Sequence, residues 1–139
     1  MINELDALRI IGERFSGSRN GIEVGIGDDA AALRTEPGKL LLVTTDCQVE
    51  DVHFVKSLIS SEDLARKSVA VSVSDIGAMG GVPKYILASL GYTKREDGSF
   101  LEGLMRGFES AEEEFGVKLV GGNLSSSEKI FLDITVLGF

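Results

Sequence analysis

Cysteine, histidine and tryptophan are nearly missing from this chain of 139 residues, which holds one cysteine, one histidine and no tryptophan. With one cysteine no internal disulfide can form, and a reducing compartment such as the cytoplasm is the expected location. His53 lies six residues after Cys47, and the two fit no nucleophile pattern. We therefore interpret Cys47 as a small buried residue rather than a catalyst.

Long apolar runs and an excess of basic residues are also absent. No stretch reaches the roughly 20 apolar residues of a membrane-spanning helix, and the N-terminus lacks the apolar region of a signal peptide. The net charge is −8, which argues against nucleic acid or an anionic membrane as a partner. A phosphate-bearing ligand would need metal ions to bridge it to so acidic a chain. Length and composition fit one compact domain over residues 1–139.

Hydrophobic periodicity and turn residues predict the secondary structure. We expect helices at 4–15, 62–79 and 99–115, and strands at 22–26, 30–33, 40–43, 85–92, 117–120 and 130–137. Asn3 and Ser61 are the expected N-caps of the first two helices, and Ser99 with Glu102 forms a capping box for the third. This order predicts an α+β or mixed α/β fold.

The segment Gly25–Leu33 reads Gly-Ile-Gly-Asp-Asp-Ala-Ala-Ala-Leu, with two glycines before two adjacent carboxylates. Glycine lets the backbone turn sharply, and paired carboxylates at a turn suggest a nearby cation such as Mg²⁺. The spacing also fits the dinucleotide fingerprint G-x-G-x-x-A. That motif needs a helix directly after it, and Glu36-Pro37-Gly38 leaves no room for one. A surface hairpin that simply favours Gly and Asp is the remaining alternative.

Three further segments place oxygen ligands at the ends of expected elements. The run Leu40–Val43 shows no alternation, which predicts a strand buried on both faces, with Thr44-Thr45-Asp46 at its end. Asp75 falls near the end of the second helix, and Asn123 follows two glycines. The sequence has neither a G-x-x-x-x-G-K-[ST] loop nor a kinase-type lysine motif, so phosphate binding would depend on metals and backbone amides.

Together these motifs resemble a known family. The order and spacing of Gly25–Ala31, Thr44–Asp46, Val52–Phe54, Ser74–Gly80 and Gly121-Gly122 are similar to those of the thiamine-monophosphate kinases, within the aminoimidazole ribonucleotide synthetase superfamily. The resemblance covers the whole chain but only the N-terminal, ATP- and Mg-binding domain of that family. It implies that the family's C-terminal domain is absent from this sequence.

The resemblance also implies a fold, an activity and a set of site residues. The fold is a small mixed β-sheet with helices packed on one face, and two such sheets pair into a homodimer. The activity is transfer of the γ-phosphate of ATP to thiamine monophosphate, with several Mg²⁺ ions and without a protein general base. Matching positions give Asp29, Thr44, Thr45, Asp46 and Asp75 as metal ligands, Gly122 and Asn123 as nucleotide contacts, and His53 as a substrate contact. Asp28 adjoins the metal ligands.

One motif departs from the family pattern. The family usually has Asp where this chain has Asn123, followed by an arginine, whereas here Leu-Ser-Ser-Ser follows. Asn offers a carbonyl oxygen without the charge, so one metal site should be weaker, and no arginine follows to meet a phosphate. Two alternatives stay open: another ATP-dependent enzyme of the superfamily, and a non-catalytic dimerisation module.

Overall fold

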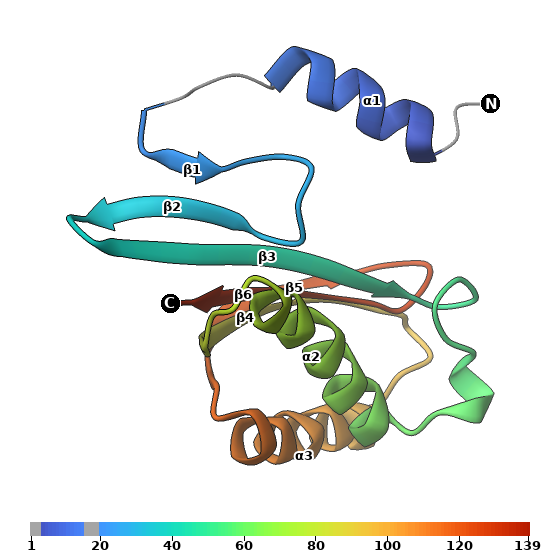
Figure 1. Cartoon of the computed structure of the whole chain (residues 1–139). Coiled ribbons are helices and arrows are strands. Elements are labelled where there is room, and N and C mark those ends of the chain that lie inside the picture. Colours follow the sequence, from blue (N-terminus) through green and yellow to red (C-terminus); the bar gives the residue numbers. More distant parts are fainter. Residues whose placement is uncertain (1–3, 16–19) are drawn as a thin grey trace.

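The structure is a computed structural model that describes residues 4–15 and 20–139. In chain order the elements are α1 (Glu4–Phe15), β1 (Ile22–Val24), β2 (Ala31–Glu36), β3 (Lys39–Val49), the 3-10 turn η1 (Lys56–Leu58), α2 (Ser61–Ala78), β4 (Pro83–Tyr92), α3 (Gly98–Phe115), β5 (Lys118–Ser126) and β6 (Phe131–Gly138) (Figure 1). The three expected helices are confirmed. The expected cap Asn3 lies outside the described residues.

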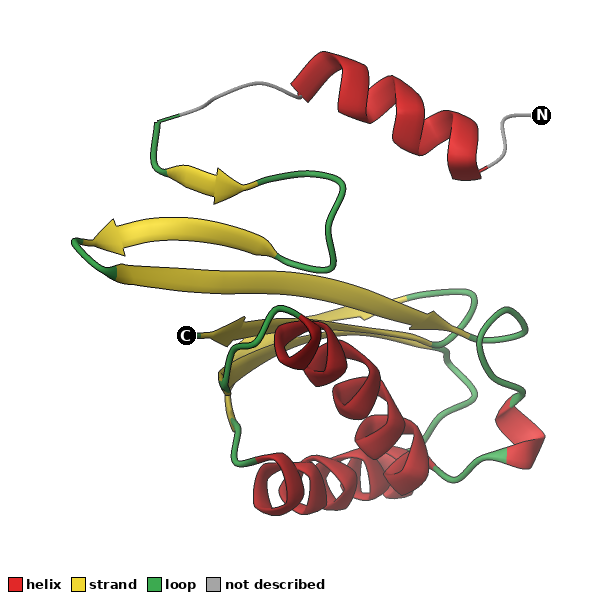
Figure 2. Ribbon diagram, in the orientation of Figure 1, coloured by secondary structure: helices red, strands yellow, loops and turns green. Residues whose placement is uncertain are grey.

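One six-stranded sheet organises the chain, with strand order β1-β2-β3-β6-β4-β5. Every neighbouring pair is antiparallel except β4 and β5, which run parallel, so the sheet is mixed. Helices α2 and α3 pack together on one face of the sheet, and α1 lies apart from them beside β1 (Figure 2). The predicted α+β architecture is therefore confirmed. None of the helices in the described parts of the chain is both long and apolar enough to cross a membrane.

The core lies between the sheet and helices α2 and α3. On β6, Leu132, Ile134 and Val136 are fully buried toward the helices, and the residues between them are partly exposed on the other face. This alternation is that of a strand with one buried face, and the strand expected at 130–137 is confirmed. We call the face that α2 and α3 leave uncovered the open face. Apolar residues of α2 and α3 are buried against the sheet and each other, whereas Leu101 of α3 is 42% exposed; the buried ones are Leu64, Val69, Val73, Ile76, Leu104, Phe108 and Ala111.

Strand β3 corrects two expectations. It runs over Lys39–Val49 and alternates between buried and partly exposed residues, so the run Leu40–Val43 is not buried on both faces. The reason is that helices cover only one face of the sheet. Its backbone ladder with β6 extends from Leu42 to Val49. As a result Thr44, Thr45 and Asp46 lie within the strand rather than at its end.

Strand β5 also differs from expectation. It continues through the double glycine to Ser126, because its parallel pairing with β4 accommodates a bulge between Leu119 and Gly121. A side chain at Gly122 would overlap the backbone of Ala88 on β4, so only glycine fits this close approach. Gly122 and Asn123 therefore lie in an edge strand, not in a turn.

The helix caps are offset by one or two residues from those expected. Ser60, not Ser61, caps α2, and its hydroxyl accepts from the backbone N–H of Asp63 at 3.0 Å. Asp97 caps α3 and accepts from the backbone N–H of Ser99 and Phe100 at 2.9 and 3.3 Å. The expected capping box does not form, because the Ser99 hydroxyl donates to Asp97 at 2.6 Å. Gly116 ends α3 in the left-handed conformation (φ 67°).

The Asp97 cap predicts a pH-dependent stability. The Ser99 hydroxyl, followed by the Phe100 and Ser99 amides, lowers the pKa of the Asp97 carboxyl below its usual value. A lowered folded-state pKa contributes stability above the unfolded-state pKa, and that contribution disappears as pH falls through the folded-state pKa. We expect Asp97→Ala to lower the melting temperature at neutral pH and to have a shrinking effect toward strongly acidic pH. Thermal melts of Asp97→Asn, which keeps a cap acceptor without the charge, provide the control.

Candidate functional site

Thr44 joins two segments that are far apart in the sequence. Its side chain points from β3 toward α2 and is 8% exposed. Its Oγ1 lies 3.1 Å from the backbone oxygen of Asp29 and 3.1 Å from Oδ2 of Asp75. The hydroxyl carries one proton, so it donates to one of these oxygens at a time. We call residues 25–29 the glycine loop. Three predicted site residues, from this loop, from β3 and from the last turns of α2, therefore meet at one point.

The glycine loop holds its two carboxylates in solvent. Asp28 and Asp29 are exposed, and Oδ1 of Asp28 accepts from the backbone N–H of Asp29 at 2.9 Å. The loop is anchored by Ala30, which is buried directly after the two acids. Gly27 adopts φ 117°, a conformation that strongly favours glycine. The local sequence thus folds so that the chain turns under the acids and re-enters the core as β2.

Asp46 is the fourth predicted site residue on the helix-covered face of the sheet. It lies two residues after Thr44 on β3, so its side chain points to the same face, where it is partly buried. Asp29, Thr44, Asp46 and Asp75, which we call the oxygen cluster, supply only oxygen ligands, the type that Mg²⁺ prefers. Within residues 4–15 and 20–139, no three His, Cys, Asp or Glu side chains are close enough to bind one ion by themselves. Any Mg²⁺ here would keep several water or phosphate ligands, as it commonly does.

Thr45 points the opposite way. Its hydroxyl lies on the open face, 2.6 Å from Oδ1 of Asp133 and 3.0 Å from the hydroxyl of Thr135, both on β6. Successive strand residues face opposite sides, so Thr44 and Thr45 cannot direct their side chains to the same ion. The structure does not bring the Thr45 hydroxyl to the oxygen cluster.

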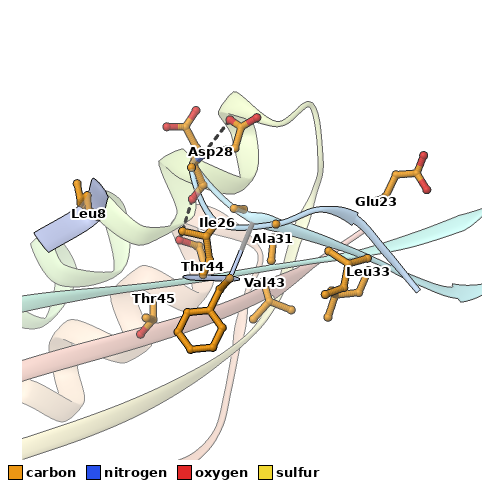
Figure 3. A pocket seen from close by; sticks show the side chains of 15 residues that line it. Leu8, Glu23, Ile26, Asp28, Ala31, Leu33, Val43, Thr44 and Thr45 are labelled. Atoms are coloured by element: carbon orange, nitrogen blue, oxygen red, sulfur yellow. Dashed lines mark hydrogen bonds between the residues drawn. The ribbon is translucent and has the colours of Figure 1, made fainter. Parts of the chain in front are cut away.

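A cavity of about 910 Å³ adjoins the oxygen cluster. Its lining includes Leu8 of α1, the glycine loop, and Leu33 and Val43 on the open face (Figure 3). In Figure 3 the Asp28 carboxylate lies on the far side of the loop from Leu33 and Val43. The cavity is therefore apolar on its floor and acidic at its rim.

Cys47 also lies on the open face and is partly exposed rather than buried. Partial burial, followed by the carboxylates of Asp133 and Asp46, raises the pKa of its thiol. A raised pKa keeps the thiol protonated at neutral pH. This agrees with the interpretation that Cys47 is not a nucleophile.

His53 lies beyond the end of β3, away from the oxygen cluster. Its Nδ1 accepts from the backbone N–H of Val49 at 3.0 Å, and its backbone oxygen accepts from Nζ of Lys67 at 2.8 Å. An accepting Nδ1 places the proton of the neutral ring on Nε2. The imidazole is exposed, so its Nε2–H is available as a donor to a bound ligand.

Gly122 and Asn123 line a second hollow at the β5 edge of the sheet, opposite the β1 edge. This groove of about 460 Å³ runs between β5 and α3 and is also lined by Leu101, Met105 and Phe108. Asn123 donates from Nδ2 to the hydroxyl of Ser125 at 3.2 Å. Sequence reasoning missed this groove, because the apolar spacing that predicts α3 assigns Leu101 to the core-facing side of the helix. The available signal was an apolar stripe on α3 wider than the core requires.

Gly122 and Asp46 lie in one row across the sheet. The row runs from Asp46 through Ile134 and Ala88 to Gly122. Three strand spacings of about 4.8 Å separate its ends by roughly 14 Å. The structure therefore places the predicted nucleotide contacts and the oxygen cluster at the same height of the sheet but not in contact.

Comparisons with known proteins agree with the motifs. The family model described as AIR synthase related protein, N-terminal domain, matches residues 27–139. The chain is 36% identical over 138 residues to the thiamine-monophosphate kinase of Bacillus subtilis, covering 99% of this chain and 42% of that protein. It is 42% identical over 113 residues to the thiamine-monophosphate kinase of Aquifex aeolicus, covering 81% and 36%. The chain thus spans about two fifths of the length of these relatives.

A solved structure shows the same fold. It is AaThiL complexed with AMPPCP and TMP, with a TM-score of 0.85 and 34% identity over 97% of this chain and 41% of that chain. The resemblance inferred from the motifs is confirmed at the level of family and fold.

Proposed function

The chain belongs to the AIR synthase related protein family, whose N-terminal domain model it matches over most of its length, and we propose on this premise that it is the ATP- and Mg-binding part of a thiamine-monophosphate kinase. The reaction is transfer of the γ-phosphate of ATP to the phosphate of thiamine monophosphate. The relatives named as this kinase are longer than the chain, which covers about two fifths of their length.

The observation that carries the proposal is the oxygen cluster. Thr44, Asp29 and Asp75 come from three segments and meet within hydrogen-bond distance, which local turn preferences do not explain. These oxygens, with Asp46 beside them, fit Mg²⁺, which would neutralise the charge of the phosphates. Phosphoryl transfer depends mainly on such neutralisation and on positioning. The acceptor phosphate is already anionic, so no protein base is needed.

The groove beside Gly122 and Asn123 is suited to the nucleoside end of ATP. Its apolar wall, formed by Leu101, Met105 and Phe108, can pack against a base. The solved relative with AMPPCP, an ATP analogue, supports nucleotide binding in this family. His53 offers Nε2–H to the substrate phosphate. We place the reaction in the cytoplasm.

The open face supplies the proposed homodimer contact. Apolar side chains that are only partly buried cross it, among them Leu33, Leu41, Val43, Leu87 and Leu137. Packing this face against a second copy would remove those side chains from water. The same contact would bury Thr45 and Asp133.

Calorimetric titration of the 139-residue chain with AMPPCP tests the proposal. We expect binding in the presence of Mg²⁺ and little or none in its absence, because metal ions must bridge the phosphates to an acidic site. Binding that is absent under both conditions, together with dimer formation, would favour the dimerisation module instead.

A further inference from the structure

A basic hollow lies between the β4–α3 loop and the β5–β6 loop, and the proposed function does not use it. It has a volume of about 490 Å³ and is lined by Thr93, Lys94 and Arg95 from the β4–α3 loop, by Ser126 at the end of β5, and by Ser127 and Glu128 after it. We propose that this hollow, the basic pocket, binds a phosphate group. That the phosphate belongs to a substrate of the kinase rests on the proposed function, whereas the binding itself does not.

Arg95 makes long contacts with two neighbouring groups. Its backbone N–H and its Nε lie 3.3 and 3.4 Å from the hydroxyl of Thr93, which is 4% exposed. One Nη contacts the carboxylate of Glu50 at 3.5 Å. The Arg95 side chain still exposes 69% of its surface, so other guanidinium donors face the solvent. The exposed guanidinium is therefore accessible to an oxyanion, and its planar fork of donors suits one.

Most carboxylates around the basic pocket already have cationic or backbone partners. Glu50 also accepts from the backbone N–H of Ile130 at 3.0 Å. Asp51 pairs with Lys129 at 3.2 Å, and Glu96 pairs with Lys56 at 3.3 Å. Lys94, by contrast, forms no hydrogen bond or ion pair with any described residue, so its ammonium group is available to a ligand.

The two loops present their donors to the same space. The backbone N–H of Ser127 donates to the oxygen of Tyr92 at 2.9 Å, which ties the β5–β6 loop to the start of the β4–α3 loop. Ser126 and Ser127 therefore line the same pocket as Lys94 and Arg95. Hydroxyl and charged donors arranged in this way suit a phosphate ester.

The location links the pocket to the expected ligands. Ser126 is three residues beyond Asn123 on β5, about 10 Å along an extended strand. No arginine follows Asn123 before the end of β5. The basic pocket supplies a cation near that position from a different segment of the chain.

Titration with inorganic tripolyphosphate in magnesium-free buffer tests the pocket directly. We expect Lys94→Gln/Arg95→Gln to weaken binding by about tenfold or more, since charge-assisted hydrogen bonds are lost. The control Lys39→Gln/Lys84→Gln removes two cations elsewhere and should leave affinity within about twofold. Equal weakening in both double variants, or none in the first, would overturn the proposal.

Two single variants guard against a trivial loss of folding. Lys94→Gln leaves the Arg95–Glu50 contact intact and should still weaken binding by about threefold. Glu128→Gln removes the carboxylate that lines the pocket and should strengthen binding by about twofold. A Glu128→Gln variant that binds no better would contradict the assigned position.

Competition identifies the source of the phosphate. Displacement of tripolyphosphate by thiamine monophosphate assigns the pocket to the acceptor, and displacement by AMPPCP alone assigns it to the nucleotide. Displacement by neither would count against a substrate role. Asp75→Asn should leave magnesium-free tripolyphosphate binding unchanged, so failure of the kinase proposal and failure of the pocket proposal give different results.

Discussion

Gly107→Ala is expected to lower the free energy of unfolding by about 1–3 kcal/mol, because α3 has no space for a methyl group at this position. A Cβ at Gly107 would overlap the backbone oxygen of Glu62 and come within 2.8 Å of Cβ of Ala65, both on α2. The backbone of a helix cannot move aside locally, so the two helices would have to separate. Gly103, one turn earlier, faces Ser61 of α2 in the same way.

The rest of the helix interface resists that separation. Arg66 and Glu114 form a bidentate ion pair with two hydrogen bonds of 2.7 Å, and Arg106 donates to Glu62 at 3.1 Å. These exposed ion pairs join α2 to α3 at the surface, and buried side chains fill the space between the two helices. A displaced α3 would therefore disturb contacts well beyond Gly107.

Urea unfolding of Gly77→Ala provides the matched control. Gly77 lies in the last turn of α2 with no atom within 4 Å of an added Cβ. Alanine is the better helix former by about 1 kcal/mol, so Gly77→Ala should be neutral or stabilising. The close-packing explanation fails if Gly107→Ala unfolds at the same urea concentration as the unmodified chain.

The sequence predicts the helices better than the strands, for a physical reason. Apolar spacing along α2 and α3 depends only on which side of each helix meets the sheet, and that spacing is local. The ends of β3 and β5 depend instead on their neighbours. Residues 40–43 look like a strand buried on both faces, yet α2 and α3 pack on only one face of the sheet. The double glycine looks like a turn, yet parallel pairing with β4 carries it through as strand.

In the candidate site, too, local features can be predicted from the sequence, and features that depend on the neighbouring strands cannot. The motifs identify Asp29, Thr44 and Asp75, which the structure brings together. The two-residue period of a strand could have shown that Thr45 faces away from Thr44. The row from Asp46 to Gly122 could not have been found, because the order of strands in the sheet is absent from the sequence. The basic pocket was hidden for the same reason, since its two loops are adjacent only after folding.

Asp75→Asn is expected to weaken Mg-dependent AMPPCP binding by at least about tenfold, or about 1.4 kcal/mol, and to leave the fold intact. The amide oxygen of Asn still accepts from the Thr44 hydroxyl, so the contact that joins α2 to β3 survives. What disappears is the charge that attracts Mg²⁺. Asp46→Asn should act similarly from the neighbouring position on β3.

Titration calorimetry with and without Mg²⁺ measures both variants, and thermal melts show whether they remain folded. Glu109→Gln removes one carboxylate from the exposed side of α3 and is the control for net charge. Loss of affinity in the two aspartate variants but not in the control would locate the metal ions at the oxygen cluster. Unchanged Mg-dependent binding in both aspartate variants would rule that location out, because neither charge could then be holding an ion.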